Sequence, residues 1–186
     1  MSSGYDLLTN EAAISVAQLL LNSKDSEDAV NYGQLSFFLS HSLSHMFDSV
    51  GWEFLFGFRN EYDGNHFRKL KCLEKQYNST TTVDDNFSDV SGLEIAHRAL
   101  VGRLGPIAMN KPPLKGYRFT NDQIFFISYA QNWCSKEEDL TNYQNGLHSP
   151  RNVRVLNPLK NSFEFAIAFN CPIGSPMNPV EKCQVW

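Results

Sequence analysis

The chain has 186 residues and a formal net charge of -4 at pH 7, and it is long enough for one domain with a sizeable core. It carries neither a basic stripe nor a long acidic run, so the charge pattern argues against nucleic acid as a partner. No apolar run reaches membrane-spanning length, and the first six residues lack the basic region and apolar core of a signal peptide. Taken alone, these features predict a soluble protein made in the cytosol.

The hydrophobic pattern predicts a mainly α-helical chain. In chain order, we expect helices over 11–21, 35–47, 67–77, 83–100, 124–134, 149–156 and 163–169. Thr120 and Gln123 have the spacing of a capping box, and Ser149-Pro150 places a cap and a proline at the start of a helix. Residues 52–58 are predicted to form a loop or short strand. Residues 102–116 and the proline-rich tail 171–186 are predicted to be irregular.

The segment His41-Ser42-Leu43-Ser44-His45 has the outline of a zinc-peptidase helix. In the H-E-x-x-H motif, two histidines at i and i+4 bind one metal ion from the same helix face, and the intervening Glu is the general base. Here Ser42 stands at the position of that Glu, and a serine hydroxyl does not deprotonate near neutral pH. The histidine spacing alone is more often found in ordinary surface or core histidines than in a metal site.

Cysteines and sequons leave the cellular compartment open. The four cysteines form no CxxC pair, which argues against a structural zinc knuckle, and their wide spacing fits long-range disulfides or free thiols. Asn78-Ser79-Thr80 and Asn86-Phe87-Ser88 are glycosylation sequons, which have meaning only if the chain is secreted.

Four segments carry a family pattern: Asn31-Tyr32-Gly33 ahead of the zinc helix, the F-F-x-x-x-A-Q-x-W-C type segment at 125–134, the H-S-P-x-x-x-R segment at 148–154, and the Cys-x-Val-Trp end at 183–186. From about residue 31 onward the chain resembles the neprilysin and endothelin-converting-enzyme family of zinc metalloendopeptidases. The resemblance implies the C-terminal helical portion of a thermolysin-like (zincin) metallopeptidase domain, mainly α, with an irregular C-terminal tail. Residues 1–30 are then an N-terminal helical or irregular segment, and 31–186 a partial neprilysin-like peptidase domain.

The same resemblance implies a metal centre. His41 and His45 stand at the zinc-ligand positions, and Ser42 stands at that of the catalytic glutamate. The segment 85–89 corresponds to the family's E-N-x-x-D pattern, so Asp85 takes the place of the third ligand. Asp89 takes that of the aspartate that orients a ligand histidine.

Other positions follow from the resemblance too. His148 matches a residue that stabilises the tetrahedral transition state, and Arg154 matches one that binds the substrate backbone. The family's disulfide pattern implies a Cys72–Cys183 bond and leaves the other two cysteines without partners.

Three departures from the family pattern shape the functional expectation. Ser42 removes general acid–base catalysis, which is worth roughly 10²–10⁴-fold in rate. Asp85 is one methylene shorter than Glu. Because zinc–carboxylate bonds lie near ~2.0–2.2 Å, a zinc ion tolerates little of this difference in reach. An upstream Asn-Ala substrate-binding motif is not found. We expect an impaired or inactive pseudopeptidase that binds a peptide substrate or peptide ligand, with zinc as the implied cofactor. The family places such chains outside the cell or on plasma-membrane ectodomains.

Two alternatives stay open. One is an active zinc metalloendopeptidase in which Glu53 or Asp48 replaces the missing base. Asp48 follows His45 by three residues, and supporting a ligand is its other possible role. The second alternative is a fragment of a longer gene product.

Overall fold

The computed structural model describes residues 4–20, 27–57, 63–134, 146 and 148–186. Its strands are β1 (Gly4–Asp6) and β2 (Glu11–Ala13), which pair antiparallel with Tyr5 opposite Ala12. The helical elements are α1 (Val16–Leu20), α2 (Asp28–Asn31), a π-helix (Tyr32–Ser36), α3 (Phe37–Ser44), a 3-10 helix (His45–Phe47), α4 (Ser49–Phe56), α5 (Asp63–Tyr77), α6 (Val83–Leu104), α7 (Pro106–Met109), α8 (Asn121–Gln131), α9 (Arg151–Asn161) and α10 (Phe163–Ala168).

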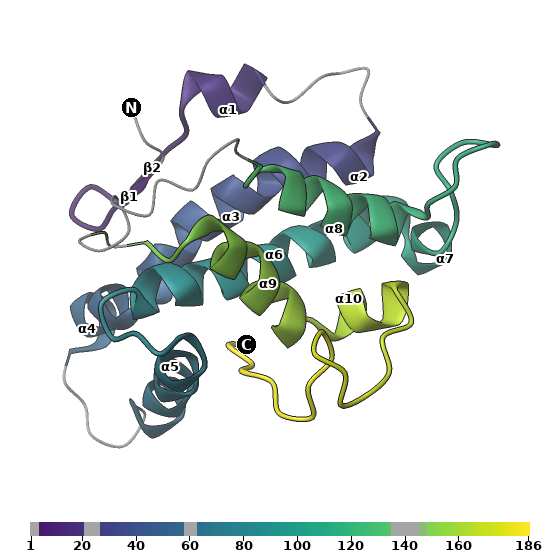
Figure 1. Ribbon diagram of the computed structural model, residues 1–186. Coiled ribbons are helices and arrows are strands. Elements are labelled where there is room, and N and C mark those ends of the chain that lie inside the picture. Colours follow the sequence, from purple (N-terminus) through teal and green to yellow (C-terminus); the bar gives the residue numbers. More distant parts are fainter. Residues whose placement is uncertain (1–3, 21–26, 58–62, 135–145, 147) are drawn as a thin grey trace.

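Helix α6 is the central element of the fold, and α3, α5, α7 and α9 all pack against it (Figure 1). The larger hydrophobic cluster lies between α3, α6 and α8 and includes Phe37, Leu93, Phe125 and Tyr129. Phe37 and Tyr129 meet edge to face, with their ring centroids 4.7 Å apart. This cluster holds α3, the helix that carries His41, against the middle of α6.

A glycine on α6 permits this close approach. A Cβ built on Gly92 would lie 2.8 Å from the backbone nitrogen of His41 and 2.9 Å from its Cα. Contacts that short do not occur without a backbone shift, so only glycine fits at this crossing of α3 and α6. The position of His41 over α6 therefore depends on Gly92, a residue without a side chain.

The mainly helical prediction is confirmed, but two segments differ from it. Residues 11–21 do not form one helix, because Glu11–Ala13 pairs with β1 and only Val16–Leu20 is helical. The Asp6 carboxylate accepts hydrogen bonds from Leu8 N and Thr9 N, which fixes the turn between the strands. This turn competes with helix formation, and its signal is weak in a single sequence.

The second difference lies at 52–58, where the prediction of a loop or short strand is wrong. Ser49–Phe56 is helix α4. The side chain of Asp48 caps its N-terminus by accepting a hydrogen bond from Gly51 N at 2.8 Å, and Gly57, with φ +66°, ends it. The prediction gave more weight to the many aromatic residues of 52–58 than to these two cap signals.

The other elements follow the predicted order with shifted ends. The capping box of Thr120 and Gln123 is present at α8, and the Ser162 side chain caps α10. Helix α9 begins one position later than predicted, because Pro150 is its N-cap and not its first helical residue, and the helix continues through Pro158. Within 102–116, residues up to Leu104 and Pro106–Met109 are helical, so that stretch is less irregular than predicted.

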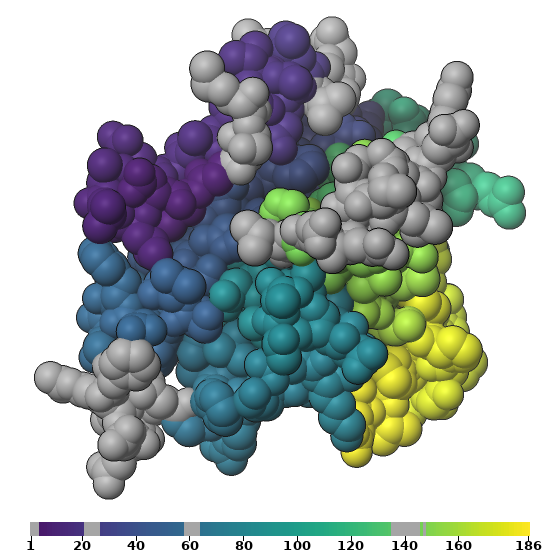
Figure 2. Space-filling view, turned by 60° about the vertical axis from the view of Figure 1, so that its left-hand side comes forward, coloured from purple at the N-terminus to yellow at the C-terminus, as the bar shows by residue number. Residues whose placement is uncertain are grey.

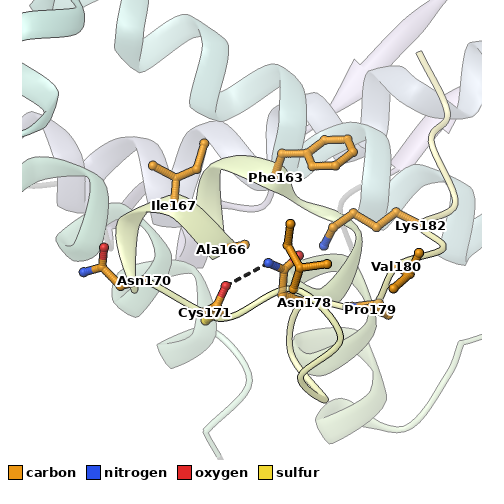
Figure 3. A pocket seen from close by; sticks show the side chains of 10 residues that line it. Phe163, Ala166, Ile167, Asn170, Cys171, Asn178, Pro179, Val180 and Lys182 are labelled. Carbon is orange, nitrogen blue, oxygen red and sulfur yellow. Dashed lines mark hydrogen bonds between the residues drawn. The ribbon is translucent and has the colours of Figure 1, made fainter.

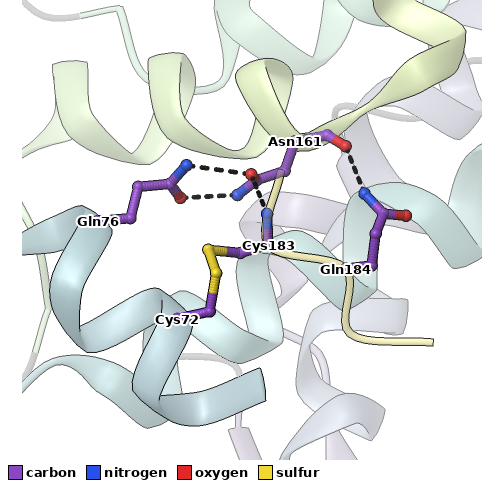
Figure 4. The surroundings of a disulfide bond; sticks show 5 residues. All are labelled: Cys72, Gln76, Asn161, Cys183 and Gln184. Carbon is purple, nitrogen blue, oxygen red and sulfur yellow. Dashed lines mark hydrogen bonds between the residues drawn. A yellow bond between two sulfur atoms is a disulfide. The ribbon is translucent and has the colours of Figure 1, made fainter. Parts of the chain in front are cut away.

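The tail after α10 is irregular, as predicted, and a disulfide ties it to α5. Cys72 and Cys183 are bonded, which confirms the predicted pair (Figure 4). Asn161 links three elements there, because it exchanges two hydrogen bonds with Gln76 and accepts a third from Cys183 N. Gln184 Nε2 also donates to the Asn161 carbonyl. Among the described helices, none is long and apolar enough to cross a membrane.

Candidate metal centre

Two histidines project from one turn of the chain toward α6. His41 lies on α3 and His45 begins the following 3-10 helix, and their ring centroids are 5.0 Å apart. The Nδ1 atom of His41 lies 2.9 Å from Asp89 Oδ1, and that of His45 lies 2.7 Å from Asp48 Oδ2. A carboxylate at Nδ1 favours the tautomer with the proton there, which leaves each Nε2 as a lone-pair donor. Both rings are thus oriented in the way that metal-binding histidines commonly are.

Asp85 completes a cluster of potential ligands from the first turn of α6. One ligand atom each from His41, His45 and Asp85 lie within 4.8 Å of one another. Asp85 is only 4% exposed; its Oδ1 lies 2.8 Å from His148 Nδ1, and its Oδ2 has no hydrogen-bond partner within the described part of the chain. A buried carboxylate oxygen without a partner is costly, and a cation beside it would offset that cost. The donor set of two imidazoles and one carboxylate fits zinc.

Asp89, one turn further along α6, forms a buried ion pair with Arg154. The Arg154 guanidinium donates from Nε and Nη2 to the two Asp89 oxygens, each at 2.7 Å, and its other face lies 4.1 Å from the Trp133 ring centroid. Burial alone would raise the pKa of Asp89, but the charge of Arg154 and the hydrogen bonds from His41 and Arg154 lower it to about 2. Asp89 therefore stays ionised and can hold His41 in place.

The guanidinium of Arg154 is largely enclosed by these contacts. Its side chain is 10% exposed, and Nη2 also lies 3.4 Å from Asp85 Oδ1. Burial acts to lower the pKa of Arg154, but Asp89 and Asp85 outweigh it and raise this pKa above its ordinary value. Arg154 thus contacts the two aspartates and balances their charge, while its contact with a substrate backbone stays a prediction.

His148 lies at the open side of the cluster. Its side chain is 62% exposed, and Nδ1 lies 2.8 Å from Asp85 Oδ1. This polar contact with Asp85 raises the pKa of His148, which favours the protonated imidazolium. The neighbouring Ser149 hydroxyl donates to Asn86 Oδ1 at 2.8 Å, and this bond fixes the segment of His148 against the start of α6.

Ser42 is buried on α3 and 1% exposed, so this position holds a small enclosed side chain. Of the two suggested replacement bases, Asp48 is already engaged, because Oδ1 caps α4 and Oδ2 contacts His45. Glu53 is exposed on α4 and is not part of the ligand cluster. The geometry therefore gives Asp48 a supporting role for a ligand.

Two contributions to the site were missing from the sequence-based picture. The ring of Trp133 packs against the Arg154 guanidinium, a contact that the sequence did not predict. The carboxylate of Asp84 accepts hydrogen bonds from Ser49 N and Ser49 Oγ, at 2.9 and 2.8 Å, and so joins the start of α4 to the start of α6. Both contacts connect residues far apart in the chain, and no local signal marks them.

A groove lies elsewhere on the molecule, between α10 and the tail (Figure 3). Phe163, Ile167 and Val180 line this groove of about 740 Å³. It contains none of the histidines or aspartates of the metal centre, so the centre is not part of this groove.

Comparison with known proteins gives a consistent picture. Neprilysin-2 of Caenorhabditis elegans is 35% identical to this chain over 206 residues, which cover 98% of this chain and 28% of that protein. Endothelin-converting enzyme-like 1 of Mus musculus is 34% identical over 193 residues, which cover 92% of this chain and 24% of that protein. The chain therefore spans about a quarter of the length of these relatives.

Solved structures share the fold. A zinc metalloprotease of Mycobacterium tuberculosis in its open state matches the whole chain with a TM-score of 0.84 at 22% identity, over 32% of its own length. The galactose-containing glycoprotein complex of Haemonchus matches 99% of the chain with a TM-score of 0.80 at 26% identity, over 35% of its own length. The chain corresponds to the C-terminal helical part of the zinc metalloprotease fold, which confirms the predicted fold class.

The family assignment rests on the sequence. The sequence model of peptidase family M13 matches residues 9–185, which is nearly the whole chain. Together with the relatives above 30% identity, this match shows that the chain belongs to peptidase family M13, as the neprilysin-like segments predicted.

Proposed function

We propose that this chain is the metal-binding portion of a neprilysin-like peptidase domain, and that it binds zinc but is catalytically impaired. The observation that carries the proposal is the convergence of one potential ligand atom each from His41, His45 and the buried Asp85 carboxylate at one place. Catalytic zinc sites use three protein ligands of this kind and leave one position open. When bound there, zinc would supply Lewis-acid polarisation of a peptide carbonyl and of water.

The residues around the ligands divide the remaining tasks. Asp89 and Asp48 hold the two histidines, and Arg154 keeps Asp89 ionised. His148 is exposed, and its raised pKa favours the protonated form, which suits a peptide carbonyl oxygen as it gains negative charge. None of these groups takes a proton from the attacking water, and Ser42 has no carboxylate to do so. We therefore expect peptide binding with little turnover.

The compartment forms part of the same proposal. The Cys72–Cys183 disulfide fits an oxidising environment, which supports an extracellular or ectodomain location. Residues 31–186 would form the peptidase-like unit, and strands β1 and β2 of the N-terminal segment contact its helix α3. The whole protein would act on, or bind, peptides.

Zinc content tests the metal proposal. Purified full chain should bind about one zinc ion per molecule by titration calorimetry and elemental analysis, and His41→Ala and His45→Ala should each lose most of this binding. His97→Gln is the matched control, because His97 also contacts a carboxylate, Asp122 at 2.7 Å, but lies outside the cluster. Equal zinc binding by all of these variants would contradict the proposed ligands.

Activity is tested on a quenched-fluorescent peptide with wild type and Ser42→Glu. The expected result is negligible cleavage by wild type and a gain of about 10²–10⁴-fold in the variant, since a general base contributes that much. If wild type already cleaves the peptide and a chelator abolishes the cleavage, the active-peptidase alternative is correct.

A further inference from the structure

The two sequons of this chain lie in opposite environments. Asn78 follows the end of α5, is exposed and has φ +50°, which is typical of Asn in a turn. Asn86 lies inside α6 and is 0% exposed. The structure thus distinguishes two sites that are equivalent in sequence.

The turn around Asn78 is ordered and open. Ser79 Oγ accepts a hydrogen bond from Thr82 Oγ1 at 2.9 Å, and Ser79 N donates to the Glu74 carbonyl at 3.2 Å, so the turn is fixed by its middle residue. Thr80, the third residue of the sequon, is exposed. An open hollow lined by Lys71, Lys75 and residues 78–81 leaves room beside the Asn78 amide. In the space-filling view, the teal region that contains α5 forms part of the outer surface, between α4 and the yellow tail (Figure 2).

Asn86 has its amide fully engaged within the fold. Its Nδ2 donates to Thr82 Oγ1 at 2.9 Å, and its Oδ1 accepts from Ser149 Oγ at 2.8 Å. The adjacent residue is Asp85, a proposed zinc ligand. Because Asn86 is 0% exposed, a sugar on its Nδ2 has no room and would displace the neighbouring Thr82 and Ser149 side chains, which would separate the Ser149 segment from α6. A chain modified there could not assemble the metal centre.

We propose that Asn78 is an N-glycosylation site of this protein and that Asn86 stays unmodified in the folded state. The acceptor chemistry joins Asn78 Nδ2 to the anomeric carbon of an oligosaccharide carried on a lipid diphosphate. The C–N bond forms as the sugar–phosphate C–O bond breaks, the lipid diphosphate leaves, and the amide loses one proton. The inference rests on the secretory location proposed above, with the Cys72–Cys183 disulfide as its support.

Site occupancy in the secreted protein tests the inference. The full chain, directed into the secretory pathway of a eukaryotic host by an added leader, is purified from the medium and treated with peptide N-glycosidase in ¹⁸O-water. Peptide mapping should find the Asp-for-Asn mass label at position 78 and none at 86. Asn78→Gln and Thr80→Ala should remove the glycan, whereas Thr81→Ala, at the exposed residue directly after the sequon, should retain it.

The opposite patterns would overturn the inference. These are an unmodified Asn78 in secreted protein whose disulfide is formed, or a glycan on Asn86 in protein that is natively folded by circular dichroism. The zinc content of the same preparation is measured separately, so a protein that carries the glycan but binds no zinc refutes only the metal proposal.

Discussion

The buried pair of Asp89 and Arg154 makes a demanding prediction about Asp89→Asn. Asp89 is 0% exposed and accepts two 2.7 Å hydrogen bonds from a guanidinium that is itself enclosed. Removing one partner of a buried ion pair leaves the other charge uncompensated and costs about 3–5 kcal/mol. Domains of this kind have only ~5–15 kcal/mol in total. The variant should therefore lose a large share of its free energy of unfolding.

Thermal and urea unfolding measure this loss. At roughly 2–4 °C per kcal/mol for a chain of this size, the midpoint of Asp89→Asn should fall by roughly 6–20 °C. Zinc affinity should also fall, by about 10–100-fold, because His41 loses the carboxylate that orients it.

The control is Glu94→Gln on the same helix. Glu94 pairs with Arg98, whose side chain is 68% exposed, and such a pair contributes under about 1 kcal/mol. A result in which Asp89→Asn and Glu94→Gln are destabilised to the same small extent would refute the assignment of Asp89 as a buried electrostatic anchor.

Two further changes test the packing of the site. Gly92→Ala should destabilise the protein by about 1–3 kcal/mol and weaken zinc binding, since the added methyl overlaps the backbone of His41, whereas Gly102→Ala, on the same helix with open space around it, should be neutral or stabilising by urea unfolding. Cys183→Ser should cost about 2–5 kcal/mol by opening the disulfide, and Cys171→Ser, at a free thiol, should change the unfolding midpoint little. Similar midpoints within either pair would contradict the packing described.

The sequence predicts the ligand cluster better than it predicts its support. His41 and His45 are four residues apart on a helix, so periodicity alone places them on one face. Asp85 could be added only through the family pattern, because its proximity depends on how α3 crosses α6 at Gly92. Arg154 was assigned to substrate, yet its contacts with Asp89 and Trp133 arise from tertiary packing that no local pattern encodes.

The elements show the same division between local and long-range causes. Helix α8 is marked in the sequence by its capping box, which the structure contains, although the helix begins at Asn121, three residues before the predicted range 124–134. The strand pair at the N-terminus was missed, because an Ala-rich and Leu-rich stretch favours a helix on propensity while the Asp6 turn and pairing with β1 decide otherwise.

Asp48 gives the protein a property that neither the helix nor the metal centre has alone. One carboxylate oxygen caps α4 and the other contacts His45, so the two functions share a single side chain. A metal that favours the observed orientation of His45 also favours the capped form of α4. By thermodynamic reciprocity, fraying of α4 lowers the affinity for the metal by the same factor. The amide of Gly51, which does not contact the metal, should therefore report on metal binding, because its hydrogen exchange should slow as zinc is added.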